Sequence, residues 1–217
     1  MSETPVAEAA APESAGTSRR REATRQKLLD AAALVFAEVG VDAASVEAIC
    51  ERAGFTRGAF YSNFETKDEL MLALTERVAG EKIDEVAERV AQLQERGEDL
   101  EPGALVRQLL DVAFDKKEGI LLTSEIRTRA MRDPRLATTY LAWQEGMVER
   151  VGSFIEELAG AYGFRLRVPA TEFAGVILQT WEDASAFGIM TGLSAAETQA
   201  MVNERTARLA TALVDPV

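Results

Sequence analysis

Apolar residues recur along most of the chain at spacings of three and four, which is the pattern of amphipathic helices. In the first such segment the pattern ends at Gly40, a residue type that commonly stops a helix. Ser45 precedes a second short apolar pattern and Thr56 a third, and both residue types are preferred helix N-caps. A turn at Gly54 separates these two short helices, so the pattern predicts a helix-turn-helix.

A long fourth helix is predicted from Thr66, where the letters T-K-D-E form a capping box. Five further helices are predicted over 102–116, 118–131, 134–161, 169–191 and 194–213. No run alternates in the manner of a strand, so we expect an all-α protein of about nine helices. The expected parts are a disordered tail (1–18), a three-helix helix-turn-helix domain (19–66) and a larger helical domain (67–217).

Composition narrows the classes of function. The chain has 217 residues, is 47% hydrophobic, and contains neither a membrane-length apolar run nor the apolar stretch of a signal peptide, so we expect a soluble cytoplasmic protein. The single cysteine, Cys50, excludes an internal disulfide; we expect a buried apolar position, the alternative being a redox sensor. Histidine is absent, which removes the usual zinc sites and catalytic triads. We predict no cofactor, no metal and no enzyme activity; Glu182 or Asp183 as a general base is the remaining catalytic alternative.

Charge is distributed unevenly. The formal net charge is -12, yet residues 19–67 hold eight Lys or Arg against seven Asp or Glu. The rest of the chain therefore carries a net charge of -13 and would repel a polyanion. Any contact with nucleic acid is expected in the N-terminal quarter. The run Arg19 to Arg21 is either an arm that touches DNA or simply solubilising charge.

The stretch ASVEAICERAGFTRGAFYSNFETKDEL resembles the DNA-binding signature of the TetR family of transcriptional regulators. The matching positions are Ser45, Ile49, Ala53, Gly54, Thr56, Arg57, Gly58, Phe60, Tyr61, Phe64 and Lys67. The resemblance is strong over about residues 24–75. Ser62 and Asn63 depart from it, because a histidine or a second aromatic residue often stands there. The resemblance implies a DNA-binding headpiece followed by a domain that dimerises through its last two long helices and encloses a small-molecule pocket.

A recognition helix must approach the major groove closely, so small residues are expected in its first turn, and hydroxyls and cations can reach phosphates or base edges. The candidate DNA-binding residues are Ser45, Thr56, Arg57, Gly58, Ala59, Tyr61, Ser62 and Lys67. Other interpretations remain open: Gly58 as a packing residue, Tyr61 as the edge of the core and Lys67 as a solvated charge. Phe55, Phe60 and Phe64 are assigned to the core.

Two apolar stripes, around Trp143 and around Trp181, are either ordinary core or the wall of the implied pocket. The candidate effector-binding residues are Phe114, Trp143, Met147, Phe173, Ile177 and Trp181. A second face of helix 169–191 could pack against a twin helix; it holds Gly175, Gln179, Glu182, Ala186 and Met190. The resulting hypothesis is a homodimeric repressor that a small, largely apolar effector releases from a palindrome-like operator in double-stranded DNA. The alternative is a helical ligand-binding or scaffold protein that does not bind DNA.

Overall fold

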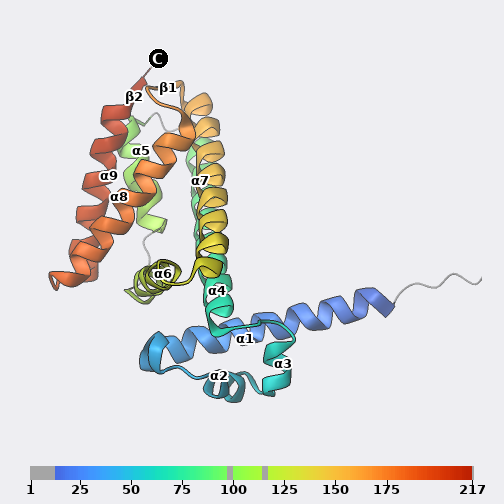
Figure 1. Cartoon of the computed structure of the whole chain (residues 1–217). Helices are drawn as coiled ribbons and strands as arrows, with labels where there is room; N and C mark the ends of the chain where they lie inside the picture. The colour runs from blue at the N-terminus through green and yellow to red at the C-terminus, as the bar shows by residue number, and fades with distance from the viewer. Residues whose placement is uncertain (1–12, 97–99, 114–116, 217) are drawn as a thin grey trace, which may run out of the picture. The chain divides into compact units, whose positions relative to one another are not determined.

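The structure, a computed structural model, describes residues 13–96, 100–113 and 117–216. Within these ranges the chain forms nine helices and one pair of very short strands (Figure 1). The all-α prediction is therefore confirmed. The chain divides into two compact units, with the division after Leu70, inside the first turns of the fourth helix.

The N-terminal unit consists of α1 (Glu13–Ala43), α2 (Val46–Ala53), α3 (Arg57–Tyr61) and the start of α4 (Lys67–Glu95). Helix α1 begins inside the segment 1–18 that we expected to be disordered, so that expectation is wrong for residues 13–18. Residues 13–18 read ESAGTS, which are mostly weak helix formers, but extending an existing helix costs little once its core turns have formed. The rest of the predicted tail, residues 1–12, lies outside the described residues. Gly40 has φ 79° and interrupts the helical geometry near the end of α1, at the predicted position.

The core of the N-terminal unit lies between these short helices. Phe60 and Phe64, which were assigned to the core, are 0% and 1% exposed, whereas Phe55 is only half-buried. Leu28 of α1 and Ile49 of α2 are also fully buried. Cys50 is buried as expected, and burial raises the pKa of its thiol.

The C-terminal unit contains the remainder of α4 and five helices close to the predicted bounds: α5 (Pro102–Ala113), α6 (Lys117–Ala130), α7 (Pro134–Tyr162), α8 (Ala170–Met190) and α9 (Ala195–Leu213). Local signals explain several helix ends. Asp133 caps α7, and Ser194 with Glu197 forms the predicted capping box of α9. Helices α5 and α8 both pack against α9, and α7 packs against α8.

Close helix packing in this unit depends on glycine. Gly188 of α8 faces Thr198 of α9, and a Cβ atom built on Gly188 would lie 2.4 Å from Thr198 Cγ2. Gly152 of α7 faces Thr171 of α8 in the same way, with Cγ2 at 3.0 Å. These glycines let neighbouring helices approach more closely than a side chain would allow.

Two strands were not predicted from the sequence. β1 (Phe164–Leu166) and β2 (Val214–Pro216) pair antiparallel, with Leu166 opposite Val214. Each strand has three residues, too few to show a period of two in the sequence. Asp215 accepts hydrogen bonds from Arg165 and Arg167, which fastens the end of the chain to the connection between α7 and α8.

Candidate nucleic-acid interface and effector cavity

The two short helices of the N-terminal unit begin with capping hydroxyls. Ser45 Oγ accepts a hydrogen bond from the Ala48 amide at 3.1 Å, and Thr56 Oγ1 accepts one from the Ala59 amide at 3.3 Å. A hydroxyl that accepts through oxygen can still donate its hydrogen. Both side chains are exposed, so Ser45 and Thr56 retain an O–H that can donate to a phosphate oxygen.

The first turn of α3 is open. Gly58 is exposed, and a Cβ atom built on it would meet only Thr56 Oγ1, at an ordinary 3.7 Å. Ala59 follows and is half-buried. No packing inside the described part of the chain requires glycine at position 58, which argues against the packing interpretation of this residue.

Arg57 is held in a small network on this surface. Its guanidinium forms an ion pair with Glu47 of α2, at 2.7 Å between Nη1 and Oε1. Its Nη2 also donates to Tyr61 Oη at 3.4 Å, one helical turn further on. The hydrogen bond to Tyr61 and the charge of Glu47 both raise the pKa of Arg57, which is therefore always charged. Because Tyr61 is 49% exposed, it is not a core residue, and its hydroxyl can still donate.

Two of the predicted DNA-contacting side chains, Ser62 and Lys67, already form hydrogen bonds within the protein. Ser62 Oγ donates to the Gly58 carbonyl at 2.8 Å, so Ser62 offers its lone pairs rather than its hydrogen. Lys67 Nζ donates to the carbonyls of Val41 and Ala44, at 2.8 and 2.9 Å. Lys67 is thus not simply a solvated charge: it ties α4 to the end of α1 and keeps one N–H for another partner.

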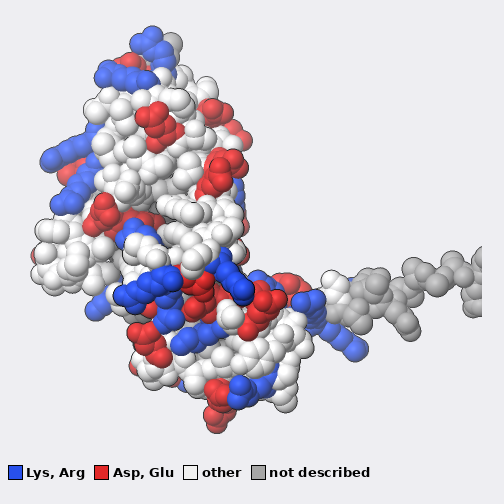
Figure 2. Space-filling model, viewed as in Figure 1, with Lys and Arg blue, Asp and Glu red and all other residues white. Residues whose placement is uncertain are grey.

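Arg25 joins α1 to the segment that follows α3. Its guanidinium lies 4.4 Å from the centre of the Phe64 ring and donates to the Asn63 carbonyl. The predicted arm, Arg19 to Arg21, is exposed and lies on the same helix, one to two turns earlier. Cationic and acidic side chains are interspersed over the face of this unit that Figure 2 shows.

The C-terminal unit contains a cavity of about 260 Å³. Residues from α4 to α9 and from the strand pair form its wall, and nearly all of them are apolar. Five of the six predicted effector-binding residues line it: Trp143, Met147, Phe173, Ile177 and Trp181. The sixth, Phe114, lies outside the described residues. The chain has two tryptophans, and both belong to this wall.

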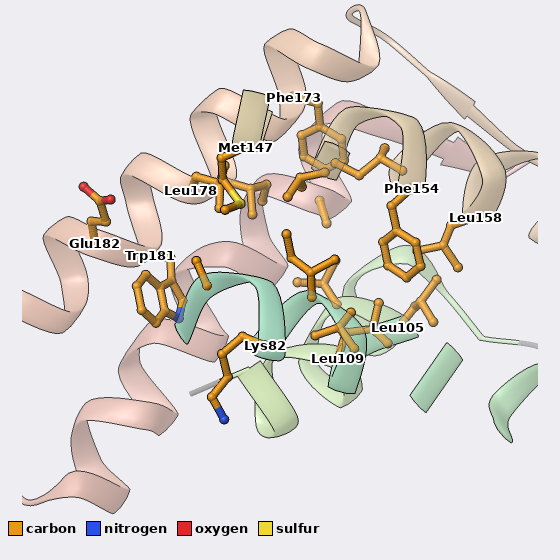
Figure 3. Close-up of a pocket in the computed structure, with 18 of the residues that line it drawn as sticks. Lys82, Leu105, Leu109, Met147, Phe154, Leu158, Phe173, Leu178, Trp181 and Glu182 are labelled. Carbon is orange, nitrogen blue, oxygen red and sulfur yellow. The ribbon is translucent and has the colours of Figure 1, made fainter. Parts of the chain in front are cut away.

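Polar side chains gather at one end of the cavity. Lys82 of α4 lies there with Trp181 and Glu182 of α8 (Figure 3). Glu182 was expected on an outer face of α8, but it forms an ion pair with Arg127 of α6, at 3.1 Å. Burial raises the pKa of Glu182, Arg127 partly offsets this, and Asp183 adds to it. Lys82 and Arg127 were not predicted at this site, because only helix packing brings them to this end.

The outer face of α8 is apolar towards its C-terminal end. Phe187 is 44% exposed and Met190 is 77% exposed. The guanidinium of Arg205 on α9 lies 5.3 Å from the centre of the Phe187 ring. Of the other residues expected on this face, Gly175 and Ala186 are half-buried and Gln179 is exposed.

Among the described residues, no cluster of His, Cys, Asp and Glu could hold a metal ion. Within the same ranges no helix combines the length and apolarity needed to cross a membrane.

Comparison with known proteins places these features in a family. Residues 28–74 match the family described as "Bacterial regulatory proteins, tetR family". The chain is 30% identical over 117 residues to the HTH-type transcriptional regulator TtgR of Pseudomonas putida, covering 54% of this chain and 51% of TtgR. It is 26% identical to the HTH-type transcriptional activator FasR of Mycolicibacterium smegmatis, covering 75% and 74%. It is 30% identical to the HTH-type transcriptional repressor Rv1474c of Mycobacterium tuberculosis, covering 63% and 65%.

The fold also extends beyond the matched headpiece. A solved TetR transcription regulator from Haloarcula marismortui superimposes with a TM-score of 0.67, at 17% identity, over 89% of this chain and all of that one. The helical fold with an N-terminal helix-turn-helix is similar to that of the helix-turn-helix regulators of transcription. The N-terminal helix-turn-helix, over residues 28–74, matches the TetR family. The chain spans about half the length of the curated relatives ArpR and TtgR of Pseudomonas putida.

Proposed function

We propose that the protein is a sequence-specific DNA-binding regulator of transcription that acts as a homodimer and is released from its operator by a small, largely apolar effector. The observation that carries the DNA-binding part is the open first turn of α3. Gly58 has no internal reason to be glycine, and it stands between Thr56 and Arg57 on one side and Tyr61 on the other. A surface that can approach a groove closely, surrounded by donors, suits duplex DNA.

The proposed role of each DNA-contacting side chain depends on which of its hydrogens are not already donated within the protein. Ser45, Thr56 and Tyr61 can each donate an O–H to a phosphate. Arg57 can exchange its exposed ion pair with Glu47 for a guanine edge or a phosphate, because exposed pairs are weak. Lys67 keeps one N–H for the DNA backbone while its other two hold α1.

The homodimer is supported by the exposed apolar face of α8. Side chains such as Phe187 and Met190 are rarely left in water as a contiguous patch unless another surface covers them. The region of α8 and α9 around their connection is mostly uncharged in Figure 2. A second copy of the same face would cover it with twofold symmetry, and two headpieces would then read a palindrome-like site.

The effector role is supported by the cavity, which is apolar and has a few polar groups at one end. An effector that favours one arrangement of the dimer would change the affinity for the operator. We propose that binding to the operator represses transcription. Because one relative is named as an activator, the direction of regulation should be measured as well.

The DNA-binding part is tested by selecting random duplexes on the full chain and measuring the enriched duplex by gel shift. Gly58→Ala should lower the affinity about tenfold, the cost of one lost close contact, without loss of stability. Gly160→Ala is the matched control, because Gly160 is also helical and exposed with nothing within 4 Å of an added Cβ. It should leave the affinity unchanged.

Two results would contradict the proposal. If no duplex is enriched, the helical ligand-binding or scaffold protein becomes the better hypothesis. If a duplex is enriched but Gly58→Ala binds it normally, then α3 is not the surface that approaches DNA. The dimer is tested independently by sedimentation, since Phe187→Glu should produce monomers. Effector binding is read from tryptophan emission, because both tryptophans line the cavity.

A further inference from the structure

The cavity has two chemically different ends. Phe154 and Leu158 of α7 lie at one end with Leu105 and Leu109 of α5, and all of these are apolar. The opposite end holds the side chains of Lys82, Trp181 and Glu182 (Figure 3). A ligand that fills the cavity therefore has an apolar body and places one end beside Trp181, because the charged groups of Lys82 and Glu182 point away from the other lining side chains (Figure 3).

The two charged groups at the polar end already have counter-charges. Lys82 Nζ donates to Glu85 Oε2 at 2.7 Å, and Glu182 pairs with Arg127 at 3.1 Å. Neither Glu85 nor Arg127 lines the cavity, so these pairs do not occupy the ligand's space. A charged ligand group would lose its hydration here without gaining an unpaired counter-ion. The polar end therefore favours an uncharged group.

Among the described residues that line this end of the cavity, Trp181 has a hydrogen-bond donor without a partner. Its Nε1 is buried and has no hydrogen-bond partner among the described residues. The indole N–H can only donate, and buried donors nearly always have an acceptor. The nitrogen itself has almost no accessible surface, but the indole belongs to the cavity wall, so a rotation of the ring would bring the N–H to an acceptor in the cavity.

We propose that the effector is an uncharged, mainly apolar molecule with one hydrogen-bond acceptor, such as a carbonyl or ether oxygen, and that Trp181 Nε1 donates to it. This inference rests on the proposed effector role of the cavity. It adds the chemical class of the effector and names the residue that selects it. A plain hydrocarbon would fill the same space and leave the donor unpaired.

The test compares butyrophenone with butylbenzene, which has a methylene group in place of the carbonyl. Their binding to the full chain is measured by calorimetry, without DNA. A hydrocarbon is driven more strongly out of water, so the informative quantity is the ratio of the two affinities in each variant. Trp181→Phe keeps an aromatic ring and removes the donor. It should lower the affinity for butyrophenone about tenfold relative to that for butylbenzene.

Two control variants separate the donor from general effects on the cavity. Trp143→Phe changes the other tryptophan of the wall, whose nitrogen is not among the buried unpartnered atoms. Ser185→Ala removes a buried, unpartnered hydroxyl one helical turn after Trp181, outside the cavity wall. Both should keep the wild-type ratio. If either shifts the ratio as much as Trp181→Phe, the assignment to Trp181 is wrong.

Charge is tested with phenylbutyrate and phenylbutylamine, which should each bind at least about tenfold more weakly than butyrophenone. Tighter binding of either ion would overturn the uncharged class. If Trp181→Phe weakens the binding of ketone and hydrocarbon equally, Trp181 does not donate to the ligand, but the uncharged class of the effector would stand. If none of the four probes binds, both this inference and the effector role fail. Operator binding is measured separately by gel shift and would stand.

Discussion

The two units hold their candidate sites in different ways, and their glycines show the difference. Gly58 in the N-terminal unit is exposed, and an added Cβ would make only an ordinary contact with Thr56, so its role is directed outwards. Gly188 in the C-terminal unit faces Thr198 so closely that its role is internal, and the same is true of Gly152. The N-terminal site is an exposed surface on two short helices near each other in sequence. The C-terminal site is a hollow whose wall exists only when several distant helices pack.

This contrast implies that a substitution at the first site should change binding with little effect on folding, whereas the second site cannot be separated from the packing of its unit. The cavity wall and the tight α8 to α9 contact share α8, which carries both Trp181 and Gly188. Four variants test how far the separation holds.

The largest effect is expected for Gly188→Ala. The new methyl group would lie 2.4 to 2.9 Å from three atoms of Thr198, a buried and stiff side chain. Overpacking of this kind should lower the free energy of unfolding by about 3 kcal/mol, measured by urea denaturation. Gly175→Ala on the same helix has nothing within 4 Å and should be neutral or slightly stabilising. Adding Thr198→Ala should restore part of the loss; if it does not, the clash is not the cause.

Lys67→Met tests the contrast in the N-terminal unit. Lys67 was predicted to contact DNA, yet its substitution should also lower stability. The variant keeps most of the apolar stem and leaves the carbonyls of Val41 and Ala44 without their donor. We expect the free energy of unfolding to fall by about 2 kcal/mol. Lys27→Met, at an exposed position on α1, is the control and should change stability little. Equal stability of both variants would mean that Lys67 acts only through its charge.

Glu47→Gln should strengthen DNA binding. The change frees Arg57 from its ion pair and removes a negative charge next to α3. An increase in affinity of about fivefold is expected at low salt, and it should shrink as salt is added. Glu51→Gln removes a charge one turn further along α2, from a residue that does not pair with Arg57 in the described ranges, and should have a smaller effect. An unchanged affinity for Glu47→Gln would show that Arg57 does not contact DNA.

The smallest effect is the pH dependence contributed by Glu182. Its pKa in the folded protein lies above the ordinary value of 4.5, mainly because of burial. At pH values between the ordinary pKa and the raised pKa, the folded state binds more protons than the unfolded state. Stability therefore falls as pH rises from about 4.5 towards neutrality. Glu182→Gln should remove this contribution, which we expect to be below about 1 kcal/mol, in urea unfolding followed against pH. Glu145→Gln, at an exposed position on α7, should keep the wild-type slope. A steeper fall in the Glu182 variant would mean that the folded state lowers the pKa of Glu182 instead of raising it.

Much of the fold could be predicted from local signals. The N-caps Ser45 and Thr56, the interruption at Gly40 and the capping box at Ser194 stand where the sequence indicated. Each acts between residues at most a few positions apart, so the sequence contains the whole interaction. The strands β1 and β2 were missed because they pair residues about fifty positions apart and are very short.

The candidate sites were also predicted only where local sequence signals were sufficient. Five of the predicted residues line the cavity, because apolar stripes at helical spacing mark the inner faces that must line any hollow. The partners of the polar groups were not predictable. Lys67 with the Ala44 carbonyl and Glu182 with Arg127 join residues far apart in the chain, and no local pattern encodes such a pair.

The sequence by itself determined where most of the helices begin and end, that the helix-turn-helix resembles that of the TetR family, and which stripes face inwards, because all of these depend on neighbours along the chain. Only the tertiary structure decided which donors remain free. Hydrogen bonds are exclusive, and their partners are chosen by packing: Thr56 keeps its O–H, Ser62 has used its own, and Trp181 is left with a buried N–H that needs an acceptor.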